Sequence, residues 1–137
     1  MRVRKMREND FPSVAAIFYK VFERHEDDAF ANAWLKFNPT LSLVAEEKDV
    51  LGFLLVTGTH IEFLGVSPDA QGKGVGTTLL HSLLDKCKRR LVNVTLVPSN
   101  NSPMLISWYI RHGFIPLRYK QGVKGEELWM ECIQNTP

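Results

Sequence analysis

The segment VSPDAQGKGVGTTLL, residues 66–80, decides how the rest of the chain is interpreted. It places Gly72, Gly74 and Gly76 directly before an apolar run with helical spacing. Glycine adopts backbone conformations, and permits close approaches to the main chain, that other residues do not. The unpaired N–H groups at the start of a helix, together with the positive end of the helix dipole, bind anions. The segment therefore predicts a loop and a helix start whose main chain binds the phosphates of a ligand.

Two other glycine-rich phosphate-binding motifs are excluded by their spacing. A dinucleotide fingerprint requires G-x-G-x-x-G after the first strand and an acidic residue ~20 positions later. Here the spacing is G-x-G-x-G in the middle of the chain, and Leu96 occupies the acidic position. A P-loop requires Ser or Thr after its lysine, whereas Lys73 is followed by Gly74. One alternative stays open, a tight turn that needs glycines only for its own geometry.

The residues around this loop predict the element order βααβββαβαββ. Short connections at 48–49 and 58–59 indicate antiparallel hairpins. The sequence thus predicts an α/β domain with a mixed, mostly antiparallel sheet of six to seven strands and about four helices. The predicted strands are 2–6, 41–47, 50–58, 60–66, 92–97 and a hairpin over 114–133, and the predicted helices are about 10–23, 26–37, 75–91 and 103–112.

Length and composition fit one intracellular domain. The 137 residues, 45% of them hydrophobic, suffice for one core, and we expect a single domain over residues 1–137. No apolar run reaches the ~20 residues of a membrane helix, and the charged N-terminus does not resemble a signal peptide. We therefore expect a cytoplasmic protein that does not bind membranes. Cys87 and Cys132 match neither a disulfide framework nor a metal-ligand spacing, so buried free thiols and no metal are expected.

The charge distribution argues against nucleic acid as a partner. The formal net charge of +2 is too small to indicate nucleic-acid binding. An acidic cluster over residues 23–28 and a basic cluster over residues 86–90 are the main charge runs. Solvated helix ends are the simplest interpretation of each cluster.

Two motifs together resemble the GNAT superfamily of acetyl-CoA-dependent N-acetyltransferases. Residues 66–76 match its V-x-P-x-x-(Q/R)-x-x-G-x-(G/A) motif, and WYIRHGF at 108–114 matches its (L/F)-Y-x-x-x-G-F segment. A predicted helix and strand join the two motifs, and the element order agrees over essentially the whole chain. The resemblance implies a GNAT fold and direct transfer of an acetyl group from acetyl-CoA to a primary amine, without a covalent enzyme intermediate.

The resemblance also implies where acetyl-CoA binds. The loop N–H groups would hold its pyrophosphate, and the end of the preceding strand would pair with its pantetheine arm. Relatives splay the sheet there with a bulge, for which Gly65 is suited. The Val66 N–H is the implied donor to the thioester oxygen, where negative charge develops. The implied binding residues are Leu64, Gly65, Val66, Gln71, Gly72, Lys73, Gly74, Val75, Gly76, Thr77, Asn101 and Tyr109. Asn101 stands one position out of register with the family pattern, and Leu105 replaces a small residue.

The implied acid–base groups are a tyrosine and two residues of one strand. Tyr109 aligns with the family's general acid, which protonates the coenzyme thiolate. His60 and Glu62 are two apart and are expected on one strand face, and either is a candidate base. The alternatives are that Glu62 binds a cationic acceptor and that water alone accepts the proton.

The acceptor prediction rests on acidic residues. Glu26, Asp27 and Asp28, at the family's acceptor-binding helix junction, together with Glu62, predict a groove for a small polycation such as a polyamine. Glu126 and Glu127 would extend this groove. The alternatives are a lysine or N-terminal amine of a peptide, a non-catalytic acetyl-CoA-binding regulatory module, and surface acids with no partner. The sequence leaves open whether the closing hairpin forms a homodimer.

Overall fold

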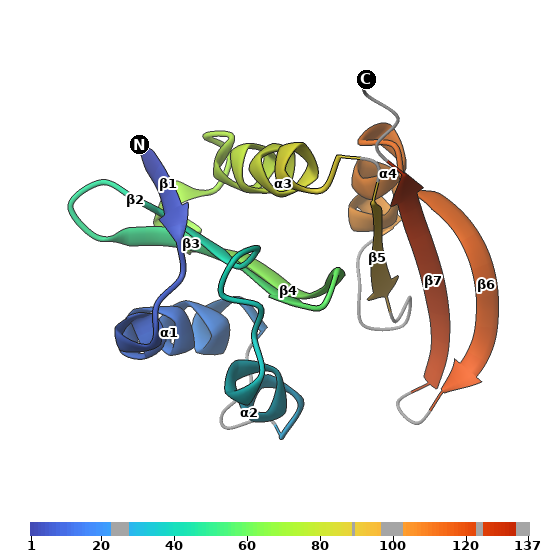
Figure 1. Ribbon diagram of the computed structural model, residues 1–137, viewed down its shortest axis with the longest axis horizontal. Coiled ribbons are helices and arrows are strands. Elements are labelled where there is room, and N and C mark those ends of the chain that lie inside the picture. The colour runs from blue at the N-terminus through green and yellow to red at the C-terminus, as the bar shows by residue number, and fades with distance from the viewer. Residues whose placement is uncertain (23–27, 89, 97–102, 123–124, 134–137) are drawn as a thin grey trace. The chain divides into compact units, whose positions relative to one another are not determined.

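The computed structural model in Figure 1 describes residues 1–22, 28–88, 90–96, 103–122 and 125–133. The chain forms two compact units, Met1–Lys86 and Cys87–Pro137, and each is described by itself. Within the described residues the order of strands and α-helices is the predicted one, with seven strands and four α-helices. The bounds are β1 Arg2–Lys5, α1 Phe11–Phe22, α2 Asp28–Leu35, β2 Leu43–Glu46, β3 Val50–Thr57, β4 His60–Val66, α3 Val75–Lys86, β5 Leu91–Leu96, α4 Pro103–Arg111, β6 Ile115–Gly122 and β7 Gly125–Ile133.

The predicted end of the helix after the glycine loop is wrong. The helical spacing of apolar residues predicts a helix through residue 91, but α3 ends at Lys86 and Leu91 begins β5. The Arg90 N–H donates to the Cys87 carbonyl at 2.9 Å, which closes a tight turn after the helix. Leu91 fits the helical spacing of the apolar residues although it is the first residue of β5. The spacing therefore made the predicted helix too long.

The first unit is an antiparallel sheet covered on both faces. Its strands pair in the order β1-β2-β3-β4. The helices α1 and α2 cover one face, and α3 lies against the opposite face (Figure 1). Phe53 and Leu55 of β3 join the core below α1 and α2, and Leu54 between them is also fully buried. A strand buried on both faces needs an apolar run rather than alternation, as the sequence LGFLLV shows.

Side chains of the α2–β2 connection fix the β3–β4 hairpin. The Asn38 amide Nδ2 donates to the Gly58 carbonyl at 2.9 Å. The hydroxyl of the fully buried Ser42 accepts the Val56 N–H at 2.9 Å and donates to the Val56 carbonyl at 3.1 Å. The Ser42 hydroxyl gives the buried Val56 N–H a hydrogen-bond acceptor, which a buried donor requires. These bonds therefore hold in place the end of the hairpin from which β4 starts.

A half-buried ion pair joins β1 to the start of α1. The Arg4 guanidinium donates to both oxygens of Asp10, at 2.7 and 2.9 Å, and to Glu46 at 3.0 Å. Asp10, which is 6% exposed, also accepts the Arg7 N–H at 2.8 Å. The hydrogen bonds from Arg4 lower the pKa of the Asp10 carboxyl, so this group stays ionised at neutral pH. The Asp10 carboxylate thus connects β1 to the start of α1.

The second unit contains a three-stranded antiparallel sheet with β7 in the middle. The register pairs Val94 of β5 with Met130 of β7, and Trp129 of β7 with Arg118 of β6. One face of this sheet is apolar and buried, and it includes Cys132 of β7. The other free cysteine, Cys87 in the turn after α3, is also buried. The prediction of buried thiols is therefore confirmed.

Candidate functional site

The glycine loop has a backbone suited to anions. Gly72 and Gly74 have φ values of 79° and 81°, a region that glycine adopts without steric cost. The Thr78 N–H donates to the Gly74 carbonyl at 3.0 Å, which is the first hydrogen bond of α3. The N–H groups of residues 75–77 precede that bond and point out of the helix start. Left-handed residues beside a helix start form a concave set of N–H groups that binds anions.

The space beside the loop glycines is open. A Cβ atom added at Gly72 or Gly74 would meet no protein atom within 4 Å. The backbone conformation, and not close packing within the protein, therefore requires glycine at both positions. Gly76 lies inside the first turn of α3. Glycine in a helix lowers helix stability by about 1 kcal/mol relative to alanine, and a loop turn does not require glycine at this helical position. A tight turn alone therefore does not account for the third glycine.

The end of β4 presents main-chain groups on its side away from β3. The Ser67 N–H donates to the Leu51 carbonyl at 2.8 Å. Because main-chain groups alternate along an antiparallel strand, Gly65 bonds toward β3, whereas Leu64 and Val66 point to the other edge. The Gln71 amide Nε2 donates to the Val66 carbonyl at 3.1 Å. An extended ligand on that edge would meet the N–H of Leu64 and of Val66.

The β4 bulge lies elsewhere than predicted. Phe63 pairs with Leu55 and Ile61 pairs with Val56, so the additional residue is Glu62. The predicted bulge at Gly65 is wrong, because Gly65 pairs regularly with Phe53. A Cβ atom at Gly65 would lie 2.7 Å from Cε1 of the Phe53 ring. Glycine is required at this position for close approach to the ring.

The bulge brings both base candidates to Thr57. The Thr57 hydroxyl donates to Oε1 of Glu62 at 2.7 Å. His60 is the register partner of Thr57, and cross-strand partners project to the same face. Both candidates are half-buried. A bulged carboxylate, rather than simple alternation along β4, thus places Glu62 near the position of His60.

Tyr109 is fixed within the second unit by its own motif. Gly113, with φ of 94°, ends α4 and turns the chain back. The Phe114 N–H then donates to the Tyr109 carbonyl at 3.1 Å, and the Phe114 ring lies edge-on to Tyr109 at 5.2 Å. Trp108 packs on Tyr109 at 5.0 Å. Tyr109 is 2% exposed, and burial raises the pKa of its hydroxyl above the ordinary value, so Tyr109 stays protonated at neutral pH.

Part of the predicted acceptor groove can be placed. Glu26, Asp27 and Asn101 lie outside the described residues. Asp28 is exposed in the first turn of α2, where a carboxylate favours the helix dipole. Stabilisation of α2 therefore explains an acidic residue at Asp28, the described residue of this acidic stretch.

The two acidic residues of β7 do not share a groove. Glu126 accepts the Tyr119 hydroxyl hydrogen, and Glu127 is paired in the ladder with Lys120. Side chains alternate between the two faces of a strand, so Glu126 and Glu127 point to opposite sides of the sheet. The expectation that both extend one acidic groove is wrong.

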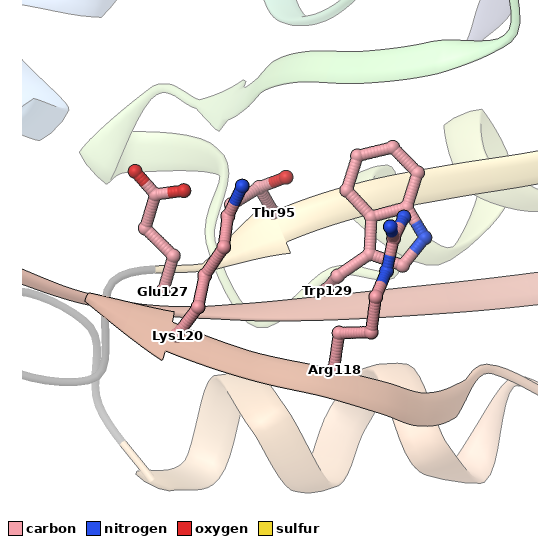
Figure 2. A pocket seen from close by; sticks show the side chains of 5 residues that line it. All are labelled: Thr95, Arg118, Lys120, Glu127 and Trp129. Atoms are coloured by element: carbon pink, nitrogen blue, oxygen red, sulfur yellow. The ribbon is translucent and has the colours of Figure 1, made fainter. Parts of the chain in front are cut away.

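A pocket that the sequence did not single out lies on the three-stranded sheet (Figure 2). It encloses about 110 Å³. Alternation along β6 could have predicted that Arg118 and Lys120 share a face, and alternation along β7 that Glu127 and Trp129 share a face. The strand pairing that joins those faces is not visible in the sequence. The pocket is lined by Thr95, Arg118, Lys120, Glu127 and Trp129.

Two other features are absent from the described residues. They contain no group of three or more His, Cys, Asp or Glu side chains placed to hold a metal ion. Of the helices described, none is long and apolar enough to cross a membrane.

Comparisons with known proteins point to one family. The sequence pattern described as "Acetyltransferase (GNAT) family" matches residues 3–114. The peptidyl-lysine N-acetyltransferase YjaB of Salmonella typhimurium is 26% identical over 91 residues, which cover 66% of this chain and 60% of that protein. YjaB of Escherichia coli is 28% identical over 91 residues, covering 66% and 59%. The chain thus matches about three fifths of the length of these relatives.

Solved structures share the fold at low identity. Ard1 from Thermoplasma volcanium has a TM-score of 0.81 at 18% identity, covering 98% of both chains. The ribosomal-protein-S18-alanine N-acetyltransferase from Escherichia coli has a TM-score of 0.79 at 18% identity, covering 99% of this chain and 95% of that chain. The apo form of YjaB from Escherichia coli, in solution, has a TM-score of 0.70 at 20% identity, covering 97% of both chains. The predicted fold is therefore confirmed.

Proposed function

Because the chain belongs to the acetyltransferase (GNAT) family, whose acetyl donor is acetyl-CoA, we propose that this acyltransferase acetylates an amine of a peptide or protein. The observation that carries the proposal is the mixed charge of the pocket in the second unit. In that pocket Glu127 lies together with Arg118 and Lys120. Charges of both signs suit a polypeptide better than a polycation. The relatives that match the sequence are named as peptidyl-lysine N-acetyltransferases, which supports a lysine side chain as the acceptor.

The described residues fit acetyl-CoA. Left-handed backbone at Gly72 and Gly74, with open space beside both glycines, suits the approach of a pyrophosphate to the N–H groups of residues 75–77. The Leu64 and Val66 main-chain groups would pair with the extended arm. Acetyl-CoA supplies an activated acetyl thioester. The Val66 N–H would stabilise the negative charge that develops on its oxygen.

Two protons must move during acetyl transfer to an amine. The nucleophile is a neutral amine, so an ammonium group must lose a proton, and the departing thiolate must gain one. We assign the second role to Tyr109, whose hydroxyl keeps its proton at neutral pH. We assign the first role to Glu62, with His60 as the alternative, because Glu62 lies at the bulge and is oriented by Thr57.

Glu62→Gln is expected to lower kcat/KM at neutral pH by about 100-fold, the typical contribution of a general base. Glutamine has the same shape and still accepts the hydrogen bond from Thr57, so the fold is retained. The deficit should shrink as the pH rises, because the acceptor amine then deprotonates without help. The measurement is a pH profile of kcat/KM for Glu62→Gln and for His60→Gln. If only His60→Gln removes the acid limb of the profile, the base is His60.

The acceptor class can be tested directly by following release of the free coenzyme A thiol. The purified protein is mixed with acetyl-CoA and either lysine peptides, N-terminal peptides or polyamines. Turnover with lysine peptides at least about tenfold above that with spermidine is expected, since a peptide fills sites on either side of the amine. Turnover with polyamines alone would overturn the peptide proposal and restore the polycation prediction. Bound acetyl-CoA without any turnover would instead indicate the non-catalytic binding module.

A further inference from the structure

The pocket on the three-stranded sheet is built from two rows of cross-strand partners. Thr95 of β5, Trp129 of β7 and Arg118 of β6 form one row. Glu127 of β7 and Lys120 of β6 form the next. Cross-strand partners share a face, as do residues two apart on one strand. All five side chains therefore project to one side of the sheet, as Figure 2 shows.

The first row has a rigid geometry. The indole Nε1 of Trp129 donates to Oε1 of Glu131 at 2.6 Å, which fixes the ring. The Cζ atom of Arg118 lies 4.7 Å from the centre of that ring. A guanidinium stacked on an aromatic face keeps its N–H donors in its own plane, available to a carboxylate. The structure thus presents a preoriented cation beside an apolar surface.

The second row adds a second cation. Glu127 does not neutralise Lys120 in an ion pair, and within the described residues no ion pair involves the Lys120 ammonium group. The Glu127 carboxylate instead lies where a side chain at Gly122 would have to stand. Figure 2 shows Lys120 on the side of the pocket toward Glu127 and Arg118 over the Trp129 ring. Of the two carboxylates on this face, Glu127 lines the pocket and Glu131 accepts the Trp129 indole N–H. The cations of Arg118 and Lys120 are therefore the groups in the pocket that can bind an anion.

We propose that this pocket recognises the carboxylate of an acidic side chain of the peptide acceptor. The carboxylate would bind between Arg118 and Lys120, and its methylene groups would lie against the Trp129 ring. This inference rests on the proposed function, because it names the kind of peptide that the enzyme selects.

The size of the pocket decides which part of a ligand it holds. Small-molecule sites usually enclose about 300–1,000 Å³, whereas this pocket encloses about 110 Å³. It can hold one side chain of a larger ligand but not a whole metabolite. A glutamate or aspartate side chain of a bound peptide has the matching size and charge, and a free amino acid would lose the remaining contacts.

The test compares single-lysine peptides that differ only in a Glu or a Gln, placed in turn at each position near the lysine. Binding is measured by fluorescence polarisation of labelled peptides in the presence of coenzyme A, and acetylation by kcat/KM. At one position the Glu peptide is expected to bind about tenfold more tightly than the Gln peptide, because the hydrogen bonds are charge-assisted. Arg118→Gln should reduce this ratio to about one, and Lys120→Gln should reduce it in part.

Matched variants separate the pocket from the overall charge of the protein. Arg111→Gln removes an exposed arginine from the end of α4, outside the pocket, and should leave the Glu-to-Gln ratio unchanged. Arg118→Glu should reverse the preference in favour of an arginine peptide. Equal binding of the Glu and Gln peptides to the unmodified protein at every position would overturn the inference. So would competition by free glutamate as strong as that by the Glu peptide.

The outcomes also distinguish this inference from the proposed function. A Glu preference in the binding measurement, without acetylation of any peptide, would support the pocket and refute the peptide acceptor as a substrate. Acetylation of all peptides at one rate, with no binding preference, would support the peptide acceptor and refute the pocket.

Discussion

Gly74→Asp is expected to abolish acetyl-CoA binding while leaving the protein folded. Gly74 has φ of 81°, and an added Cβ atom would meet no protein atom within 4 Å. The aspartate carboxylate would stand where the pyrophosphate is proposed to bind. Two like charges 4 Å apart repel by about 4 kcal/mol at an effective dielectric constant of 20. The dissociation constant for acetyl-CoA should therefore rise by at least about 100-fold.

Gly58→Asp is the matched control for that substitution. Gly58 has φ of 59° and likewise no protein atom within 4 Å of an added Cβ, but it lies in the β3–β4 hairpin. Aspartate causes the same kind of backbone strain there, about 1–2 kcal/mol for a left-handed residue, and adds the same charge. Calorimetric titration with acetyl-CoA should detect binding to Gly58→Asp and none to Gly74→Asp. Equal affinities of the two variants would mean that the loop is only a tight turn.

Tyr109→Phe is expected to lower kcat by about 100-fold without changing the affinity for acetyl-CoA. General acids typically contribute 10²–10⁴-fold, and phenylalanine lacks the proton that the thiolate requires. The packing is preserved, because the contacts of Tyr109 with Trp108 and Phe114 are ring contacts. Burial raises the pKa of Tyr109. Ionisation of Tyr109 should therefore cause no loss of activity in the unmodified enzyme at any pH below about 10, which is the ordinary pKa of tyrosine.

Tyr119→Phe provides the control for the loss of a tyrosine hydroxyl. Tyr119 is 57% exposed and its hydroxyl donates to Glu126, so its removal should change neither kcat nor acetyl-CoA affinity. Single-turnover kinetics with a saturating acceptor measure the chemical step in both variants. Full activity of Tyr109→Phe would show that water, or another group, protonates the thiolate.

The sequence by itself determined the order of the elements and the glycine loop before α3. Both are local properties. Helical and strand periodicities each extend over a single element, and the glycines before α3 act on their own backbone. The Tyr109 motif is local as well, since Gly113 and Phe114 fold back onto a residue one turn away. The cytoplasmic location, the single-domain organisation and the homodimer stay predictions from the sequence.

The tertiary structure alone decided the β4 bulge and the pocket on the second sheet. The bulge belongs to Glu62 because the register with β3 shifts there, while Gly65 is kept small by the Phe53 ring. The pocket combines residues of β5, β6 and β7, which become neighbours only when the strands pair. Cross-strand pairing joins residues distant in the chain, and no periodicity within one strand specifies its register with another. For this reason the glycine loop could be predicted from the sequence, whereas the pocket on the second sheet required the fold.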